Sequence, residues 1–104
     1  MKRALGSLGL AMKSGRVRCG EETCVKLVRA GAASLVLIDA AISDGSRKAV
    51  ADACAFHQVP CRQIPSGELG RAIGKPGRMV AAITDKALAQ RLDALLLDAD
   101  TTID

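Results

Sequence analysis

The sequence is short of aromatic residues. Among its 104 residues there is no tryptophan and no tyrosine, and Phe56 is the single phenylalanine. A protein that holds single-stranded nucleic acid by stacking bases on several rings needs a set of such side chains. That mode of binding is therefore excluded. The chain also lacks an unbroken run of about 20 apolar residues, so we expect no membrane-spanning helix.

Metal-binding and redox motifs are missing as well. The four cysteines, Cys19, Cys24, Cys54 and Cys61, leave gaps of four and six residues within the two pairs. Those gaps do not match the C-x-x-C spacing of zinc ribbons or of thiol redox motifs. We therefore predict buried free thiols in a reducing cytoplasm, with no metal and no cofactor.

No set of side chains suits catalysis. His57 is the one histidine, and it falls on the apolar face of a predicted helix at 45–58, where core packing is the better interpretation. Glu21 and Glu22 are adjacent, so they point in different directions on a helix. The segment Gly70–Lys75 resembles a phosphate loop, but it has three residues between its glycines and a proline after its lysine. We predict that the protein is not an enzyme, and an enzymatic role for His57 and the thiols ranks last.

Positive charge is concentrated in two segments. Residues 1–31 contain seven basic side chains against two acids, and residues 62–78 contain four against one. The last twelve residues hold four aspartates and no base, so the folded body is more basic than the net charge of +4 suggests. If the two basic segments meet in space, they form a surface that attracts polyanions. The alternative is that these side chains only solvate helix faces.

Helical and strand patterns alternate along the chain. Helices are predicted at 2–13, 21–30, 45–58, 67–73 and after Asp85, and strands at 16–19, 34–39, 61–64 and 78–84. This order predicts an α/β protein, a three-layer α/β/α sandwich with a four-stranded mixed sheet. We expect one domain over residues 1–97, followed by an acidic, frayed tail at 98–104.

The start of the second helix is the best candidate binding site. Gly20 lets backbone N–H groups approach a ligand, and a helix N-terminus favours phosphate. Lys26 and Arg29 add positive charge near it. Glu21 and Glu22 would oppose phosphate but would accept hydrogen bonds from base amino groups. A purely structural role is the alternative, because acids in a first turn stabilise any helix and Glu22 with Lys26 is an ordinary surface pair.

Five segments, in their order and spacing, resemble the kink-turn-binding ribosomal protein superfamily, and above all its small bacterial members. They are Gly20-Glu-Glu-x-x-Val-Lys26, Leu35–Ile38, Ser43-x-x-Ser46-x-Lys48, Val59-Pro60 and Leu69-Gly-Arg-Ala-Ile-Gly-Lys75, and the likeness spans residues 3–92. The resemblance implies the α/β/α sandwich and binding to sharply bent RNA loops with sheared G·A pairs. It implies that the second helix start meets those bases and that the turn at 73–78 holds the extruded nucleotide.

Together, the charge pattern and the resemblance predict an RNA-binding site. Its residues are Gly20, Glu21, Glu22, Thr23, Lys26, Arg29, Ile73, Gly74, Lys75 and Arg78. Archaeal and eukaryotic members have an Asn-Glu pair where this chain has Glu22-Thr23, so we expect recognition of RNA shape more than of base identity.

The expected protein is a cytoplasmic monomer, ribosomal or ribosome-associated. Its expected partner is a structured RNA, a kink-turn in ribosomal RNA or a riboswitch, with no small-molecule substrate. The alternative is a protein-binding accessory factor of the translation machinery that uses the same fold without RNA.

Overall fold

Helices and strands alternate along almost the whole chain. The computed structural model describes the backbone of residues 2–102 and the side chains of residues 3–97. In chain order the elements are α1 (Lys2–Lys13), β1 (Val17–Cys19), α2 (Glu21–Arg29), β2 (Leu35–Asp39), α3 (Asp44–Phe56), β3 (Cys61–Ile64), α4 (Glu68–Ile73), β4 (Val80–Ile83) and α5 (Lys86–Thr102). Up to the start of α5, each element lies within two residues of its predicted position.

The strand that comes last in the sequence lies inside the sheet. The strand order is β1-β4-β2-β3, with β4 antiparallel to both of its neighbours and β2 parallel to β3. This confirms the predicted mixed sheet of four strands. Because β4 runs against the others, its first residue lies at the same edge as the last residues of β1, β2 and β3. The loops described below lie at that shared edge of the sheet.

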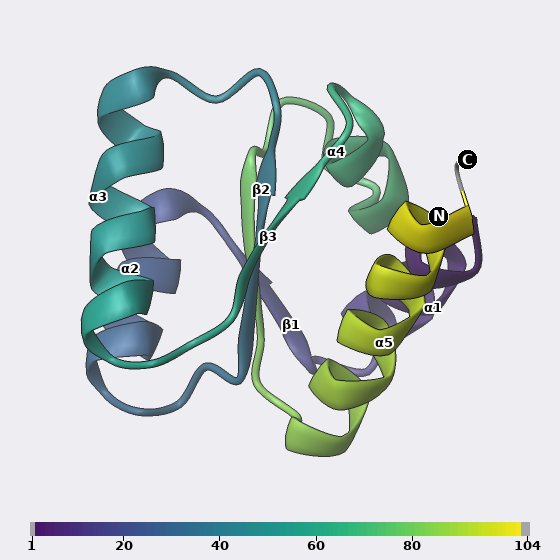
Figure 1. Cartoon of the computed structure of the whole chain (residues 1–104), viewed down its shortest axis with the longest axis horizontal. Coiled ribbons are helices and arrows are strands. Elements are labelled where there is room, and N and C mark those ends of the chain that lie inside the picture. Colours follow the sequence, from purple (N-terminus) through teal and green to yellow (C-terminus); the bar gives the residue numbers. More distant parts are fainter. Residues whose placement is uncertain (1, 103–104) are drawn as a thin grey trace.

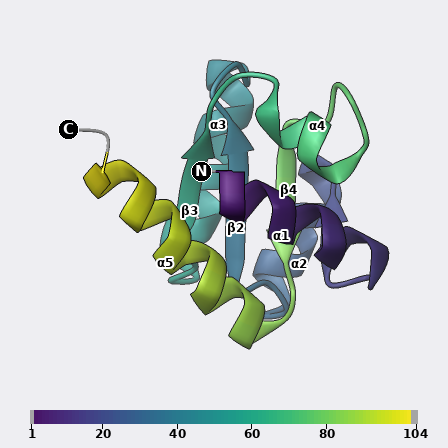
Figure 2. The ribbon, with the colours of Figure 1, turned by 90° about the vertical axis from the view of Figure 1, so that its right-hand side faces the viewer.

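The helices cover both faces of the sheet. Helices α2 and α3 lie on one side, and α1, α4 and α5 lie on the other (Figure 1). Turned by 90°, the molecule shows α5 and α1 crossing in front of the strands (Figure 2). The three-layer sandwich predicted from the alternating pattern is confirmed.

The central strand β2 contributes to two separate cores. Leu35 and Leu37 pack with α1, α4 and α5, whereas Val36 and Ile38 pack with α2 and α3. All four are buried, because strand side chains point alternately to opposite faces and both faces are covered. This explains why the strand reads as an unbroken apolar run.

Two helix ends differ from the sequence prediction. Helix α4 was predicted to begin at residue 67, but Gly67 is its N-cap, in a left-handed conformation with φ +80° and no side-chain cap. Gly67 tolerates this conformation because it has no Cβ. Helix α5 continues to Thr102, past residue 97 where the domain was expected to end. Residues 103–104 of the predicted frayed tail lie outside the described residues.

Helices α1 and α4 approach closely at a glycine. A Cβ added to Gly9 would lie 3.0 Å from the carbonyl oxygen of Ala72, whereas a Cβ on Gly6 would meet nothing within 4 Å. Both glycines lie within α1, where an alanine is intrinsically the better helix former. An alanine at Gly6 therefore tests helix propensity alone, whereas an alanine at Gly9 also tests the packing of α1 against α4.

We expect Gly6→Ala to raise the free energy of unfolding by about 0.5 to 1 kcal/mol, because alanine loses less backbone entropy in a helix. Gly9→Ala should lower it, because the added methyl group pushes α1 away from α4. Urea denaturation followed by circular dichroism measures both variants. Equal stabilisation by the two substitutions would show that the helices do not touch at Gly9.

Candidate functional site

Four loops meet at one edge of the sheet, which we call the loop edge. It consists of Gly20, residues 40–43, residues 65–67 and residues 74–79, each joining a strand end to a helix. Helices α2, α3 and α4 all begin there, toward the top of Figure 1. Positive helix dipole ends and backbone N–H groups are therefore gathered at one edge.

A buried carboxylate organises the loop edge. Asp39, the last residue of β2, is 2% exposed and is the only buried charged residue among the described side chains. Its Oδ1 accepts the N–H of Ala41 at 2.8 Å, and its Oδ2 accepts the N–H of Gly67 at 2.8 Å. Its own N–H donates to the carbonyl of Met79 at 2.8 Å. Asp39 thus holds three of the four loops together. Sequence reasoning missed this role, although a lone acid ending an apolar run was a usable signal.

The start of α2 has the conformation that its glycine suggested. Gly20 has φ +104° and ψ 136°, and its N–H donates to the carbonyl of Val80 at 3.0 Å. No side chain caps this helix. Thr23 is half-buried, and Glu21 and Glu22 are exposed. The helix start is therefore open to a ligand.

Lys26 forms an ion pair of the kind the sequence indicated. Its Nζ lies 3.5 Å from Oε1 of Glu22, and both side chains are exposed. Such a pair contributes little to stability and is readily exchanged for another partner. Lys26 thus remains available to an anion.

The second loop approaches the first one. Gly74 ends α4 with φ +72°, and Gly77 has φ +89°, both left-handed. Within the described part of the chain, Lys75 and Arg78 are exposed and in no ion pair. A Cβ on Gly20 would lie 3.5 Å from Nη1 of Arg78. The two predicted basic segments therefore meet.

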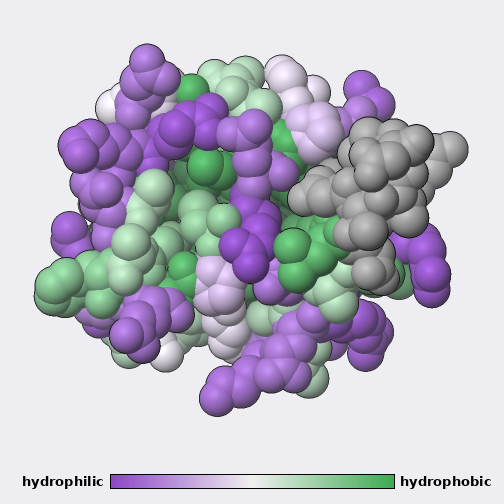
Figure 3. All heavy atoms as spheres, in the orientation of Figure 1, coloured by the Kyte–Doolittle hydropathy of each residue, from purple (hydrophilic) through white to green (hydrophobic). Residues whose placement is uncertain are grey.

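A shallow hollow lies between the two loops. It has a volume of about 460 Å³ and is lined by Gly20, Glu21, Ser43, Ser46 and Arg78, among others. Ser43 accepts the N–H of Ser46 at 3.3 Å as the cap of α3. In Figure 3 most of the surface at the upper left of the molecule, where α3 begins, is hydrophilic. The hollow thus offers hydroxyl groups and a guanidinium, two groups that bind phosphate oxygens.

Two predicted site residues are not at the loop edge. Arg29 is the last residue of α2, at the opposite end from Gly20. Ile73 is 5% exposed and packs in the core with α1 and α5, so its side chain faces inward. Spacing along a sequence does not tell which way a side chain at a helix end points. The other predicted residues are together at the helix start and the second loop.

The prediction that His57 packs in the core is wrong. Helix α3 ends at Phe56, and His57 is exposed, with its ring 5.0 Å from that of Phe56 at 70°. The prediction assumed a helix that continues to residue 58. Instead Gln58 adopts φ +58°, and the N–H of Val59 donates to the carbonyl of Cys54 at 2.8 Å. Val59 then takes the inward position that helical spacing had assigned to His57.

All four cysteines are free, as predicted, but only two are fully buried. Cys24 and Cys54 are buried, whereas Cys19 and Cys61 are half-buried. Burial raises the pKa of Cys24 to about 12. A hydrogen bond between Cys54 and Cys61 raises the pKa of Cys54 and lowers that of Cys61 to about 7, against the opposing effect of burial. Cys61 is therefore the thiol most easily ionised of this pair.

Among the described residues, no three His, Cys, Asp or Glu side chains are grouped so as to hold a metal ion. In the same part of the chain, every helix is too short or too polar to cross a membrane.

Replacing Asp39 by asparagine should destabilise the fold. One amide oxygen can still accept, but the NH₂ group then faces a backbone donor, which is left unpaired. We expect the free energy of unfolding to fall by about 1 to 3 kcal/mol in urea denaturation. The matched control is Asp52→Asn, which breaks an exposed pair with Lys48 and should change it by less than about 0.5 kcal/mol. Small, equal changes in the two variants would contradict the role of Asp39.

Alkylation should detect the ionised form of Cys61. Because its pKa is lowered to about 7, its thiolate fraction rises between pH 6 and pH 8, and its reaction rate with iodoacetamide should rise in the same range. In Cys54→Ala the hydrogen-bond donor is lost, so this rise should move to higher pH. Mass spectrometry of peptides assigns the label. An unchanged pH profile in the variant would contradict the hydrogen bond.

Comparison with known proteins agrees with the resemblance. The profile of the ribosomal protein L7Ae/L30e/S12e/Gadd45 family matches residues 2–92. The chain is 40% identical over 90 residues to the RNA-binding protein YlxQ of Bacillus subtilis (strain 168), covering 86% of this chain and 90% of the relative. It is 32% identical over 96 residues to the RNA-binding protein YlxQ of Enterococcus faecium, covering 91% and 92%.

Solved structures show the same fold. A protein of unknown function from Bacillus halodurans superposes with a TM-score of 0.88 at 33% identity, covering 92% of this chain and 98% of that one. The Giardia lamblia 15.5kD RNA binding protein superposes with a TM-score of 0.73 at 26% identity, covering 93% and 84%. Because the profile match covers nearly the whole chain, the protein belongs to the ribosomal protein L7Ae/L30e/S12e/Gadd45 family and is a YlxQ-like member of it.

Proposed function

We propose that the protein binds a sharply bent, kink-turn-like RNA at its loop edge. The observation that supports this most is the approach of Arg78 to Gly20, which brings an unpaired guanidinium beside an uncapped helix start. Backbone N–H groups and a flanking cation together form a site for the phosphates of a folded RNA.

The second loop supplies the complementary part of the site. Lys75 and Arg78 are exposed on a turn with two left-handed glycines, so the RNA backbone can approach the main chain closely. Beneath this turn, Gly70 is buried, and a Cβ there would lie 3.1 Å from the carbonyl oxygen of Lys75. The turn therefore rests directly on α4 and keeps its cations in place.

The chemistry of the site favours recognition of shape. Among the described residues the loop edge presents no aromatic side chain for stacking, and Glu22-Thr23 lacks an amide that donates to a guanine. Phosphate contacts position an RNA without reading its bases. A protein of this kind binds the bent RNA better than the extended one and so shifts its population.

The comparisons support the same function. The two YlxQ relatives and the Giardia structure are described as RNA-binding proteins, and the family is described as ribosomal. We therefore infer a cytoplasmic RNA partner, of which ribosomal RNA is the first to test. The loop edge and the first turn of α2 hold the predicted residues other than Lys26, Arg29 and Ile73, and Lys26 lies one turn further along α2, which makes this surface the place to test the contact.

The test is a fluorescence titration of labelled kink-turn RNA against a continuous duplex, at two salt concentrations. We expect tighter binding to the kink-turn, weakening as salt rises because counterions are released from the RNA. Lys75→Ala, Arg78→Ala and Lys26→Ala should each weaken binding about tenfold and reduce the salt slope by about one. Arg91→Ala is the control, because Arg91 is exposed on α5 and, among the described residues, in no ion pair.

Equal, weak binding to both RNAs would rule out the kink-turn proposal. If Lys26→Ala bound the kink-turn RNA as tightly as the parent, Lys26 would not be part of the binding site. Binding of a protein partner that does not weaken with salt would instead favour the accessory-factor alternative.

A further inference from the structure

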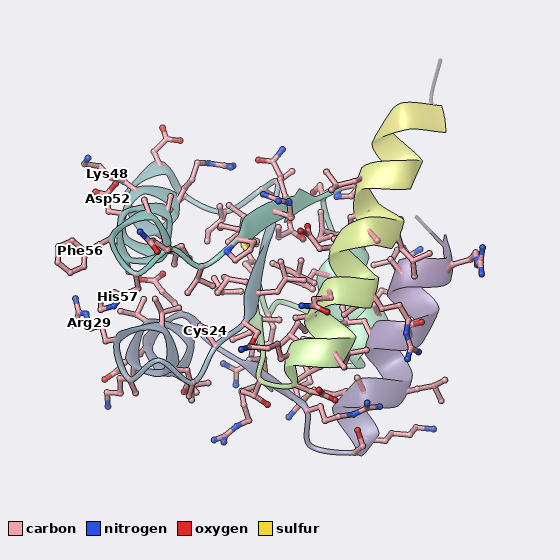
Figure 4. All side chains as sticks on the ribbon, turned by 60° about the horizontal axis from the view of Figure 1, so that its bottom comes forward. Cys24, Arg29, Lys48, Asp52, Phe56 and His57 are labelled. Atoms are coloured by element: carbon pink, nitrogen blue, oxygen red, sulfur yellow. The ribbon has the colours of Figure 1, made fainter. Side chains whose placement is uncertain are left out.

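The far end of α2 and α3 carries side chains that the loop edge does not use. Both helices start at the loop edge, so both end at the opposite end of the molecule. Phe56, the only aromatic residue, is 83% exposed there. In Figure 4 Phe56, His57 and Arg29 point outward from the ends of these two neighbouring helices.

We propose that Phe56, His57 and Arg29 form a second RNA contact, which receives one unpaired nucleotide. Its base stacks on the ring of Phe56, and its phosphate pairs with Arg29. This proposal rests on RNA binding at the loop edge and extends it. We call the three residues the far-end contact.

The rings are arranged to leave a stacking surface open. The ring planes of Phe56 and His57 are 70° apart, with centroids at 5.0 Å, so the two rings meet edge to face. With most of its surface exposed, the phenylalanine has a face free for a flat partner. Any base can stack on such a face, because every base has a π surface. One ring is too few for a stacking groove but enough for one nucleotide.

A hollow lies beside the rings. It has a volume of about 420 Å³, and its lining includes His57, Gln58, Val28, Gly31 and Lys86. Val28 lies in the last turn of α2 and Gly31 just after it, while His57 and Gln58 follow α3, so the ends of both helices border the same space. Of the three far-end residues, His57 lines this hollow, and Phe56 and Arg29 are next in sequence to the lining residues His57 and Val28.

The charges at this end favour a polyanion. The nearby acids are already paired: Asp52 with Lys48 at 3.2 Å, and Asp93 with Arg62 at 2.7 Å. Asp85, at the start of α5, is paired with Arg16 at 3.2 Å. Among the described residues, Arg29 and Lys86 are in no ion pair. The balance of free charge at this end is therefore positive.

A nucleotide fits these features better than a protein does. A stable protein interface buries about 800 Å² on each partner around an apolar centre. Here one exposed ring is bordered by cations and a histidine, which suits a base with its phosphate. One RNA can also reach both contacts, because Arg29 is eight positions after Glu21 on α2, about 12 Å at the rise of a helix. An RNA that leaves the loop edge along α2 passes Lys26 before it reaches Arg29.

Two labelled RNAs test the proposal: a kink-turn core, and the same core with a single-stranded extension of four nucleotides. We expect the extension to tighten binding to the parent protein roughly tenfold. Phe56→Ala and Arg29→Ala should abolish this gain and leave affinity for the core RNA unchanged. Phe56→Leu keeps an apolar side chain without a π face, so it should also lose the gain. Leu10→Ala, which removes a side chain 68% exposed on α1, should keep it.

A second readout comes from Phe56→Trp. The chain has no other tryptophan and no tyrosine, so the emission of this indole reports on the far-end contact alone. The extended RNA should quench it, and the core RNA should not. An extension that adds no affinity and leaves the emission unchanged would overturn the proposal and point to a protein as the occupant.

The two proposals fail in different ways. Equal loss of affinity for both RNAs in Phe56→Ala would overturn the far-end contact, because Phe56 would then act through the fold. If the parent bound the core RNA no better than a duplex, the proposal of kink-turn recognition at the loop edge would be wrong, and the far-end contact that rests on it would fall with it.

Discussion

The arrangement of the loops depends on how β2 ends. The strand is apolar and buried on both faces until Asp39, whose carboxylate accepts two backbone N–H groups from different loops. A buried carboxylate is tolerated only where hydrogen bonds replace its hydration, and these two donors do so. The loops that supply them lead into α3 and α4. One side chain therefore sets where both helices begin relative to the sheet, and with them the hollow at the loop edge.

A site held in this way is suited to recognition by shape. The backbone that carries the free N–H groups at the start of α2 and the turn at 74–79 is held in place by main-chain hydrogen bonds, from the N–H of Gly20 to the carbonyl of Val80 and from the N–H of Lys75 to the carbonyl of Gly70. Preorganised donors lose little entropy when a ligand binds, so a rigid bent RNA gains more from them than a flexible one. Few charges are needed, which agrees with the modest net charge of the chain.

The sequence predicted which segments form the candidate surface better than it predicted the position of each side chain on it. Gly20 and Arg78 lie together where the two basic segments meet, and Lys26 with Glu22 lies beside them on α2. Arg29 is not among them, because it lies at the other end of α2, and Ile73 is not, because it lies on the face of α4 that packs in the core. His57 was assigned to the core by helical spacing, but α3 ends at Phe56, before it reaches His57. The role of Asp39 was not predicted, because it depends on N–H groups that are distant in sequence, such as that of Gly67.

Local pattern alone determined the elements and their order, since periodicity acts within a few neighbouring residues. Family motifs added the location of the site. Tertiary structure decided the position of β4 inside the sheet, the contacts of Asp39 and the exposure of Phe56 and His57. Each of these depends on segments that are far apart along the chain and meet only when the layers pack, and no local pattern contains that information.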